Sequence, residues 1–132
     1  MKIILTNGKE LMPYQVTGKP KYVQGANRDT LTFIFDEAYS MDELDAIMTA
    51  AACESINIVG DDGSEAIHRG YTIRATLEKK YVEVQPATES TEAVFENRIF
   101  VSMAQRTYAE TTLAETQAAL ELILSGETGE EV

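Results

Sequence analysis

Asp61, Asp62, Glu65 and His68 form the one cluster of side chains in the sequence that could bind a metal ion or move a proton. The spacing of a calcium loop is absent, because such a loop needs oxygen ligands at alternate positions before its glycine and a glutamate six residues after it. His68 has no serine, cysteine or carboxylate placed beside it by the local sequence, so a surface histidine is favoured over a general base. We expect a solvated acidic turn here, and no metal site.

Other kinds of catalytic or cofactor site have little support. Cys53 is the single cysteine, which excludes an intramolecular disulfide, and its position after three alanines favours a buried thiol. The glycines of 60–63 lack the spacing and the following Lys-Ser/Thr of a phosphate-binding loop. Because no nucleophile, base and oxyanion donors occur together, we expect no cofactor and no enzymatic activity.

Composition limits the partners. The chain has 132 residues, of which 44% are hydrophobic and 25% charged, as expected for one globular domain. Its 22 acidic and 11 basic residues give a net charge of -11, which repels phosphate backbones and anionic lipid. The apolar run at the start of the chain is much shorter than a signal-peptide core. We therefore expect no nucleic acid or membrane partner, and a chain made in the cytoplasm.

The first half of the chain predicts strands and one helix. An Asn7-Gly8 pair after an apolar run predicts a tight hairpin, with a return strand through Leu11 toward Val16. The stretch from Gly18 to Asn27 reads as irregular, and alternation over 29–36 predicts a half-buried strand. Ser40 and Glu43 have capping-box spacing, and an apolar stripe follows them at helical spacing. We expect a helix near 40–53, after the third strand.

The second half predicts a sheet that continues before a last helix. A short strand over 54–59 and an acidic turn at 60–63 lead to the longest strand. Within it, the apolar residues change from odd-numbered to even-numbered positions. A turn or bulged bend at 78–80 is the expected cause. A polar loop over 87–92 precedes a last strand near 98–103.

The C-terminal segment carries the candidate interaction residues. Thr112 and Glu115 have capping-box spacing and Gly126 has the usual position after a helix end, which predicts a helix over 110–126 and a disordered acidic tail over 127–132. Its stripe consists of Leu113, Leu120, Ile123 and Leu124. Two heptads are too short for a helix stable by itself, so the stripe must cover either the protein's own sheet or a neighbouring subunit. Both alternatives remain open, and the acidic residues after Gly126 favour the second.

The stretch from Val101 to Arg106 and on through Thr112 to Leu120 resembles the end of small accessory tail proteins of bacteriophages and prophages. The order of elements, with its Asn-Gly hairpin, Leu-Thr-Phe-Ile-Phe strand, Ser-Met-Asp-Glu-Leu helix and Gly-Tyr-Thr-Ile before a long strand, is also similar to theirs. The resemblance implies a structural role in or near the tail or baseplate, and no catalytic residues.

The predicted fold is therefore α+β: a mostly antiparallel body over 1–109 with one helix inserted after the third strand, followed by a C-terminal helix. The predicted function is that of a non-enzymatic virion structural or accessory protein that contacts other tail proteins or its own copies as a homo-oligomer, in the bacterial cytoplasm during assembly and then in the virion. The alternative is a small β-rich ligand- or carbohydrate-binding module, in which Tyr71, Tyr81 and Tyr108 would supply stacking faces.

Overall fold

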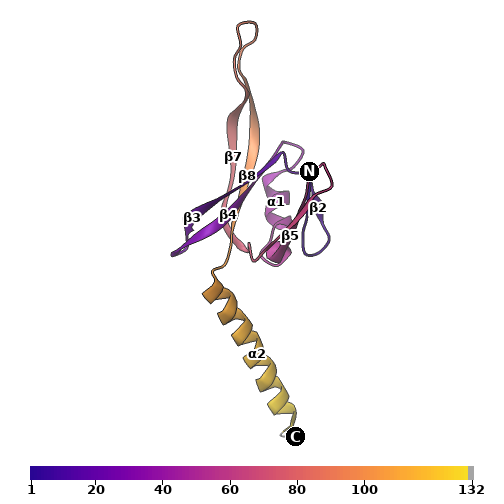
Figure 1. Ribbon diagram of the computed structural model, residues 1–132, viewed down its shortest axis with the longest axis vertical. Coiled ribbons are helices and arrows are strands. Elements are labelled where there is room, and N and C mark those ends of the chain that lie inside the picture. The colour runs from indigo at the N-terminus through magenta and orange to yellow at the C-terminus, as the bar shows by residue number, and fades with distance from the viewer. Residues whose placement is uncertain (131–132) are drawn as a thin grey trace.

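The computed structural model describes the backbone of residues 1–130 and the side chains of residues 1–113 and 115–121. It has two four-stranded antiparallel sheets, a short helix packed on them and a long C-terminal helix that leaves the body (Figure 1). The predicted α+β class is confirmed.

The first sheet has the strand order β2-β1-β5-β6. Its strands are β1 (Lys2–Ile4), β2 (Glu10–Leu11), β5 (Ser55–Val59) and β6 (Glu65–Arg69). The predicted hairpin joins β1 to β2: Gly8 has a φ of 83°, and the Asn7 side-chain oxygen accepts a hydrogen bond from the Lys9 amide at 3.1 Å. The return strand is shorter than expected, because the chain crosses to the second sheet immediately afterwards.

The second sheet has the order β3-β4-β8-β7, and its first hairpin corrects the sequence interpretation. Strands β3 (Gln15–Val23) and β4 (Ala26–Phe35) occupy the stretch expected to be irregular. They meet at a tight turn in which Gln24 and Gly25 both have positive φ, at 46° and 81°. Pro20 is tolerated because β3 is an edge strand, where a missing amide breaks no ladder bond on the outer side. Four strands, not three, therefore precede the first helix.

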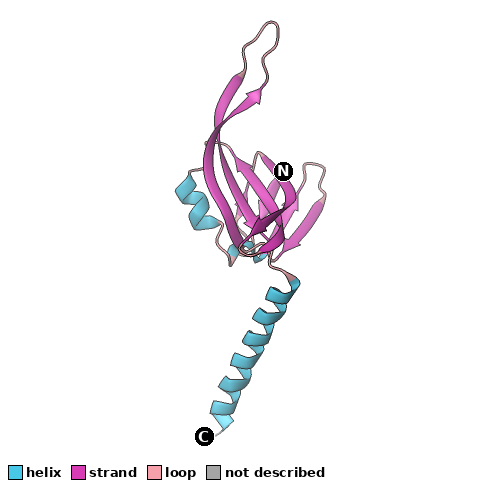
Figure 2. Ribbon diagram, turned by 90° about the vertical axis from the view of Figure 1, so that its left-hand side faces the viewer, coloured by secondary structure: helices cyan, strands magenta, loops and turns pink. Residues whose placement is uncertain are grey.

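The other half of this sheet is a long hairpin of β7 (Ile73–Gln85) and β8 (Val94–Ala104). The break expected at 78–80 is absent; the register shifts instead near Ala75 and Val84. The far part of the hairpin projects beyond the body (Figures 1 and 2), so no core enforces the alternation of its side chains there. This explains why the switch of apolar residues from odd to even positions did not mark a turn.

The first helix, α1 (Met41–Ile47), begins as predicted, with the Ser40 hydroxyl accepting a hydrogen bond from the Glu43 amide at 3.1 Å. It ends earlier than residue 53. The Thr49 hydroxyl accepts a hydrogen bond from the Ala52 amide at 3.2 Å, which competes with helix continuation, and a short 3-10 turn, η1 (Ala52–Glu54), follows.

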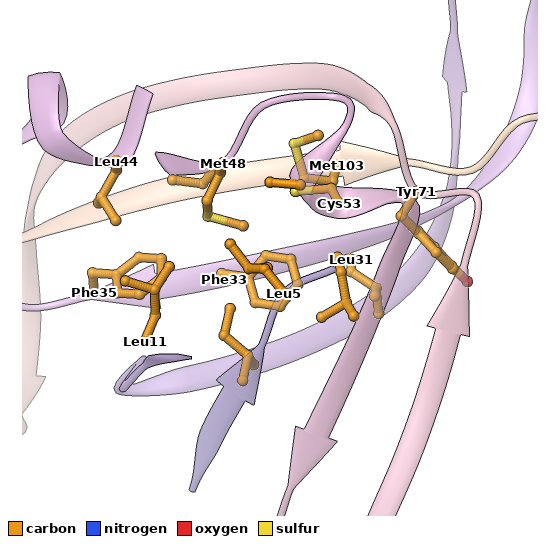
Figure 3. Close-up of a cluster of buried hydrophobic side chains, with 14 of the residues drawn as sticks. Leu5, Leu11, Leu31, Phe33, Phe35, Leu44, Met48, Cys53, Tyr71 and Met103 are labelled. Atoms are coloured by element: carbon orange, nitrogen blue, oxygen red, sulfur yellow. The ribbon is translucent and has the colours of Figure 1, made fainter. Parts of the chain in front are cut away.

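One core lies between the two sheets and α1. Figure 3 shows Leu44 and Met48 from the α1 side pointing toward Phe33 and Phe35 of β4. Cys53 is fully buried there, as predicted, and burial raises the pKa of its thiol to about 11. The buried apolar cluster draws on residues from Ile3 to Met103; its members are Ile3, Leu5, Leu11, Leu31, Phe33, Phe35, Leu44, Met48, Ala52, Cys53, Ile56, Tyr71, Ile99, Val101 and Met103.

We expect Phe33→Ala and Leu44→Ala each to lower the free energy of unfolding by about 2 to 5 kcal/mol, because both side chains are fully buried and truncation leaves a cavity. Urea denaturation followed by far-ultraviolet circular dichroism measures the loss. Tyr22→Ala is the matched control, since the Tyr22 ring is exposed. Core variants as stable as this control would contradict the assignment.

Candidate interaction surface at the C-terminal helix

Helix α2 (Tyr108–Glu130) starts at a different cap from the one expected. The Thr107 hydroxyl accepts a hydrogen bond from the Glu110 amide at 3.2 Å, and the Glu110 carboxylate accepts one from the Thr107 amide at 2.9 Å. This is a reciprocal capping box. Thr112 and Glu115 have the same spacing but lie inside the helix, because the earlier pair had already started it.

The other end of α2 also differs from the expectation. The helix continues through Gly126 to Glu130, so residues 127–130 are helical. A glycine inside a helix costs about 1 kcal/mol relative to alanine and does not by itself end the helix. Residues 131 and 132 of the expected acidic tail lie outside the described residues.

Arg28 of β4 holds the start of α2 against the body. Its side chain is 3% exposed, and all five of its N–H donors are engaged. The Nε group donates to the Val23 carbonyl at 2.7 Å, and the two terminal nitrogens donate to the carbonyls of Gln24 and Gln105 at 3.2 and 3.3 Å. The remaining two bonds reach both carboxylate oxygens of Glu110, in a bidentate ion pair.

This ion pair explains the electrostatics of the junction. Hydrogen bonds from Arg28 and from the Thr107 amide hold the pKa of Glu110 at about 2, well below its ordinary value of 4.5. The same carboxylate thus caps the helix and neutralises a buried guanidinium. Sequence reasoning missed both residues. The Thr107 and Glu110 spacing was a readable signal, whereas nothing local marks Arg28, which lies 82 positions away.

A groove of about 730 Å³ separates the first turns of α2 from the end of the body. On the body side, the Arg106 guanidinium is paired with the Glu54 carboxylate at 2.5 Å, and the Gln105 amide donates to the Arg69 carbonyl at 3.0 Å. The residues of α2 that line this groove are Tyr108, Thr111, Glu115 and Ala118. After Tyr108, the lining residues of α2 are therefore polar or small.

Leu113 and Leu120 of the predicted stripe lie on the opposite face of α2. With about 100° per residue, Leu120 lies about 20° from Leu113, whereas the four groove-lining positions lie about 140° to 160° from Leu113. Leu113 and Leu120 are 58% and 54% exposed. Figures 1 and 2 show the helix extending away from both sheets, so these two leucines do not cover the protein's own sheet. Ile123 and Leu124 also belong to α2, but their side chains are outside the described set.

The residues with potential metal or proton chemistry do not converge. Asp61 is paired with the N-terminal ammonium group. The Ser64 side chain and the Ser64 amide, the latter at 3.0 Å, hydrogen-bond to the Asp62 carboxylate and lower its pKa. Glu65 and His68 lie on β6 at positions of opposite parity, so they project to opposite faces of the sheet. Among the described residues, no group of three or more histidine, cysteine or acidic side chains has metal-site geometry.

The three tyrosines of the alternative function lie in separate parts of the molecule. Tyr71 is buried in the core. Tyr81 lies on the projecting hairpin, where it stacks on Phe95 with ring centroids 5.5 Å apart. Tyr108 is 88% exposed at the start of α2. They form no shared binding platform.

Comparison with known proteins found no matching family model, curated protein or solved structure. Within residues 1–130, no helix is both long and apolar enough to cross a membrane.

We expect a chain that ends at Thr111 to unfold with nearly the free energy of the parent, because its core and the Arg28–Glu110 pair both remain. A chain that ends at Arg106 should be less stable, because the buried guanidinium loses its carboxylate. Urea denaturation of the two chains makes the comparison. If the longer chain is molten by near-ultraviolet circular dichroism, α2 belongs to the core after all.

The junction should also be sensitive to acid. Because the pKa of Glu110 is lowered from 4.5 to about 2, its contribution to stability is complete above about pH 4.5 and is lost as the pH falls through 2. The difference in unfolding free energy between the parent and Glu110→Gln should therefore narrow over this range. Glu115→Gln removes an exposed carboxylate from the same helix and serves as control. A difference that stays constant from pH 7 to pH 2 would contradict the coupling.

Proposed function

We propose that this chain is a non-enzymatic structural or accessory protein of a bacteriophage or prophage tail or baseplate, and that it acts through protein–protein contacts. The observation that supports this most directly is the exposure of Leu113 and Leu120 on a helix that projects from a body whose buried cluster ends at Met103. A helix held at one end gains little from its own packing, so a partner would supply the missing burial.

The projecting hairpin supports the same role. The β7–β8 arm and α2 extend from opposite ends of the body (Figure 1). Near the outer part of the arm, Tyr81 and Phe95 stack with an interplanar angle of 23°, and the two residues are 67% and 44% exposed. A body with exposed apolar groups on two opposed projections suits contacts with neighbours on both sides, as a tail or baseplate component requires. The resemblance of its C-terminal stretch to phage accessory tail proteins points the same way.

The proposed partners are other tail proteins or copies of the chain itself. The net charge of -11 argues against nucleic acid and anionic membranes. The protein would be made in the bacterial cytoplasm and carried into the virion during assembly.

A β-rich ligand-binding module is the second candidate, because the stacked Tyr81 and Phe95 rings present an exposed aromatic surface of the kind that binds sugar faces. The two candidates differ in what Tyr81→Ala would do. A ligand module would lose glycan binding, measured on an array of bacterial surface glycans, whereas a structural protein would show none in either form.

The structural role is tested in a lysogen that carries the gene. After induction, phage particles or tails are purified on a density gradient, and the chain is detected by mass spectrometry. We expect it to co-purify with the particles at a fixed ratio to a major tail protein. A chain that stays in the particle-free fraction while complete tails form without it would rule the role out.

A further inference from the structure

The charges of the chain are divided unevenly between the body and α2. Every lysine and arginine lies at or before Arg106, whereas the last part of the chain carries only acidic groups. These are Glu110, Glu115, Glu121, Glu127, Glu130 and Glu131. Glu110 is already neutralised by Arg28, so the net negative charge of α2 increases toward its far end.

The body end from which α2 starts carries four basic side chains; Arg28 and Arg106 are already paired with Glu110 and Glu54, whereas Lys21 and Arg69 have no ion pair among the described residues. Arg28 joins the β3–β4 turn to the start of α2, and Lys21 is its register partner on β3. Arg69 and Arg106 line the groove beside the first turns of the helix. The unsatisfied amides of a helix N-terminus add partial positive charge at the same place. The two ends of the projecting segment therefore have opposite electrostatic character.

The central part of the seam, between residues 112 and 126, carries no charge. In a heptad with Leu113 and Leu120 at the a positions, the d positions before residue 126 are Ala109, Thr116 and Ile123, and the next a and d positions are Glu127 and Glu130. The flanking e and g positions between residues 112 and 126 are Thr112, Gln117, Ala119, Leu124 and Gly126. Glu115 and Glu121 fall at c and b, away from the seam. Because e and g charges set the choice of partner in coiled coils, an uncharged stretch of seam places no like-charge repulsion against pairing with an identical helix.

We propose that the leucine face of α2 packs antiparallel against α2 of a second copy of this chain, with Leu113 of each copy against Leu120 of the other. This pairing rests on the proposed structural role and names the partner of that surface. The antiparallel direction brings the acidic far end of each helix to the basic body end of its partner. A parallel arrangement would instead place all the acidic far ends together.

The geometry of one copy is compatible with such a pair. The leucine face points away from the groove and from the body, so a second helix can approach it without displacing any described contact. A two-heptad seam is too short to hold free helices. Here the capping box and the Arg28–Glu110 pair already order the first turn and set its direction, which lowers the entropy lost on pairing. The contact is isologous and closes as a dimer.

Sedimentation velocity on the full chain tests the pairing. We expect a dimer, and Leu113→Glu combined with Leu120→Glu should weaken dimerisation about tenfold or more. Thr111→Glu combined with Ala118→Glu adds the same charge to the opposite face and should leave it unchanged. A parent that is monomeric up to about 1 mM would overturn the pairing. A dimer that survives the leucine changes would overturn it too, and would leave the structural role intact through another surface.

Disulfide trapping tests the direction. A mixture of Leu113→Cys and Leu120→Cys chains should give the mixed dimer on oxidation, because the two positions face each other in an antiparallel pair. Cys53 is fully buried, so the parent is the blank. Disulfides between identical positions would show a parallel pair and overturn the direction.

Failure of the pairing and failure of the proposed function remain separable. A dimer with the expected variants, found together with tails that lack the chain, would sink the virion role and keep the pairing. A chain that is incorporated into the particles but is monomeric when purified would rule out the pairing and keep the virion role.

Discussion

The arrangement of the molecule depends on one buried guanidinium. Arg28 lies in β4, where burial without partners would be costly, and it is satisfied by three backbone carbonyls and one carboxylate. The carbonyls belong to the last residue of β3, to the β3–β4 turn and to the residue after β8, and the carboxylate belongs to α2. Four parts of the chain are therefore held at one point, and the direction in which α2 leaves the body is set there.

This junction holds α2 by its first turn. The described residues of the helix beyond that turn are not fixed to the body by a comparable contact. Among the described side chains the buried cluster runs from Ile3 to Met103, and the groove beside the helix is lined on the helix side by Tyr108 and by small or polar residues. Leu113 and Leu120 face the other way. A helix that is held at one end and uncovered beyond it suits contacts between molecules. The β7–β8 arm at the opposite end of the body also presents exposed apolar groups.

Local signals predicted part of this architecture well. The Asn7-Gly8 turn and the Ser40 cap act within a few residues, so the first hairpin and the start of α1 could be read from the sequence. The β3–β4 hairpin could not, because its turn uses Gln24 in a conformation more typical of glycine or asparagine. The cap of α2 was misplaced because two pairs, at 107 and 112, have the same spacing and only the tertiary contact of Glu110 selects the first.

The sequence by itself determined the α+β class, the buried thiol of Cys53 and the leucine stripe, because alternation, helical spacing and apolar composition are properties of neighbouring residues. Tertiary structure alone decided which side of α2 faces the body and which is uncovered. That choice depends on a contact between Arg28 and Glu110, 82 residues apart, and no local pattern encodes an ion pair across such a distance. The buried Arg28 therefore orients α2 so that Leu113 and Leu120 remain exposed.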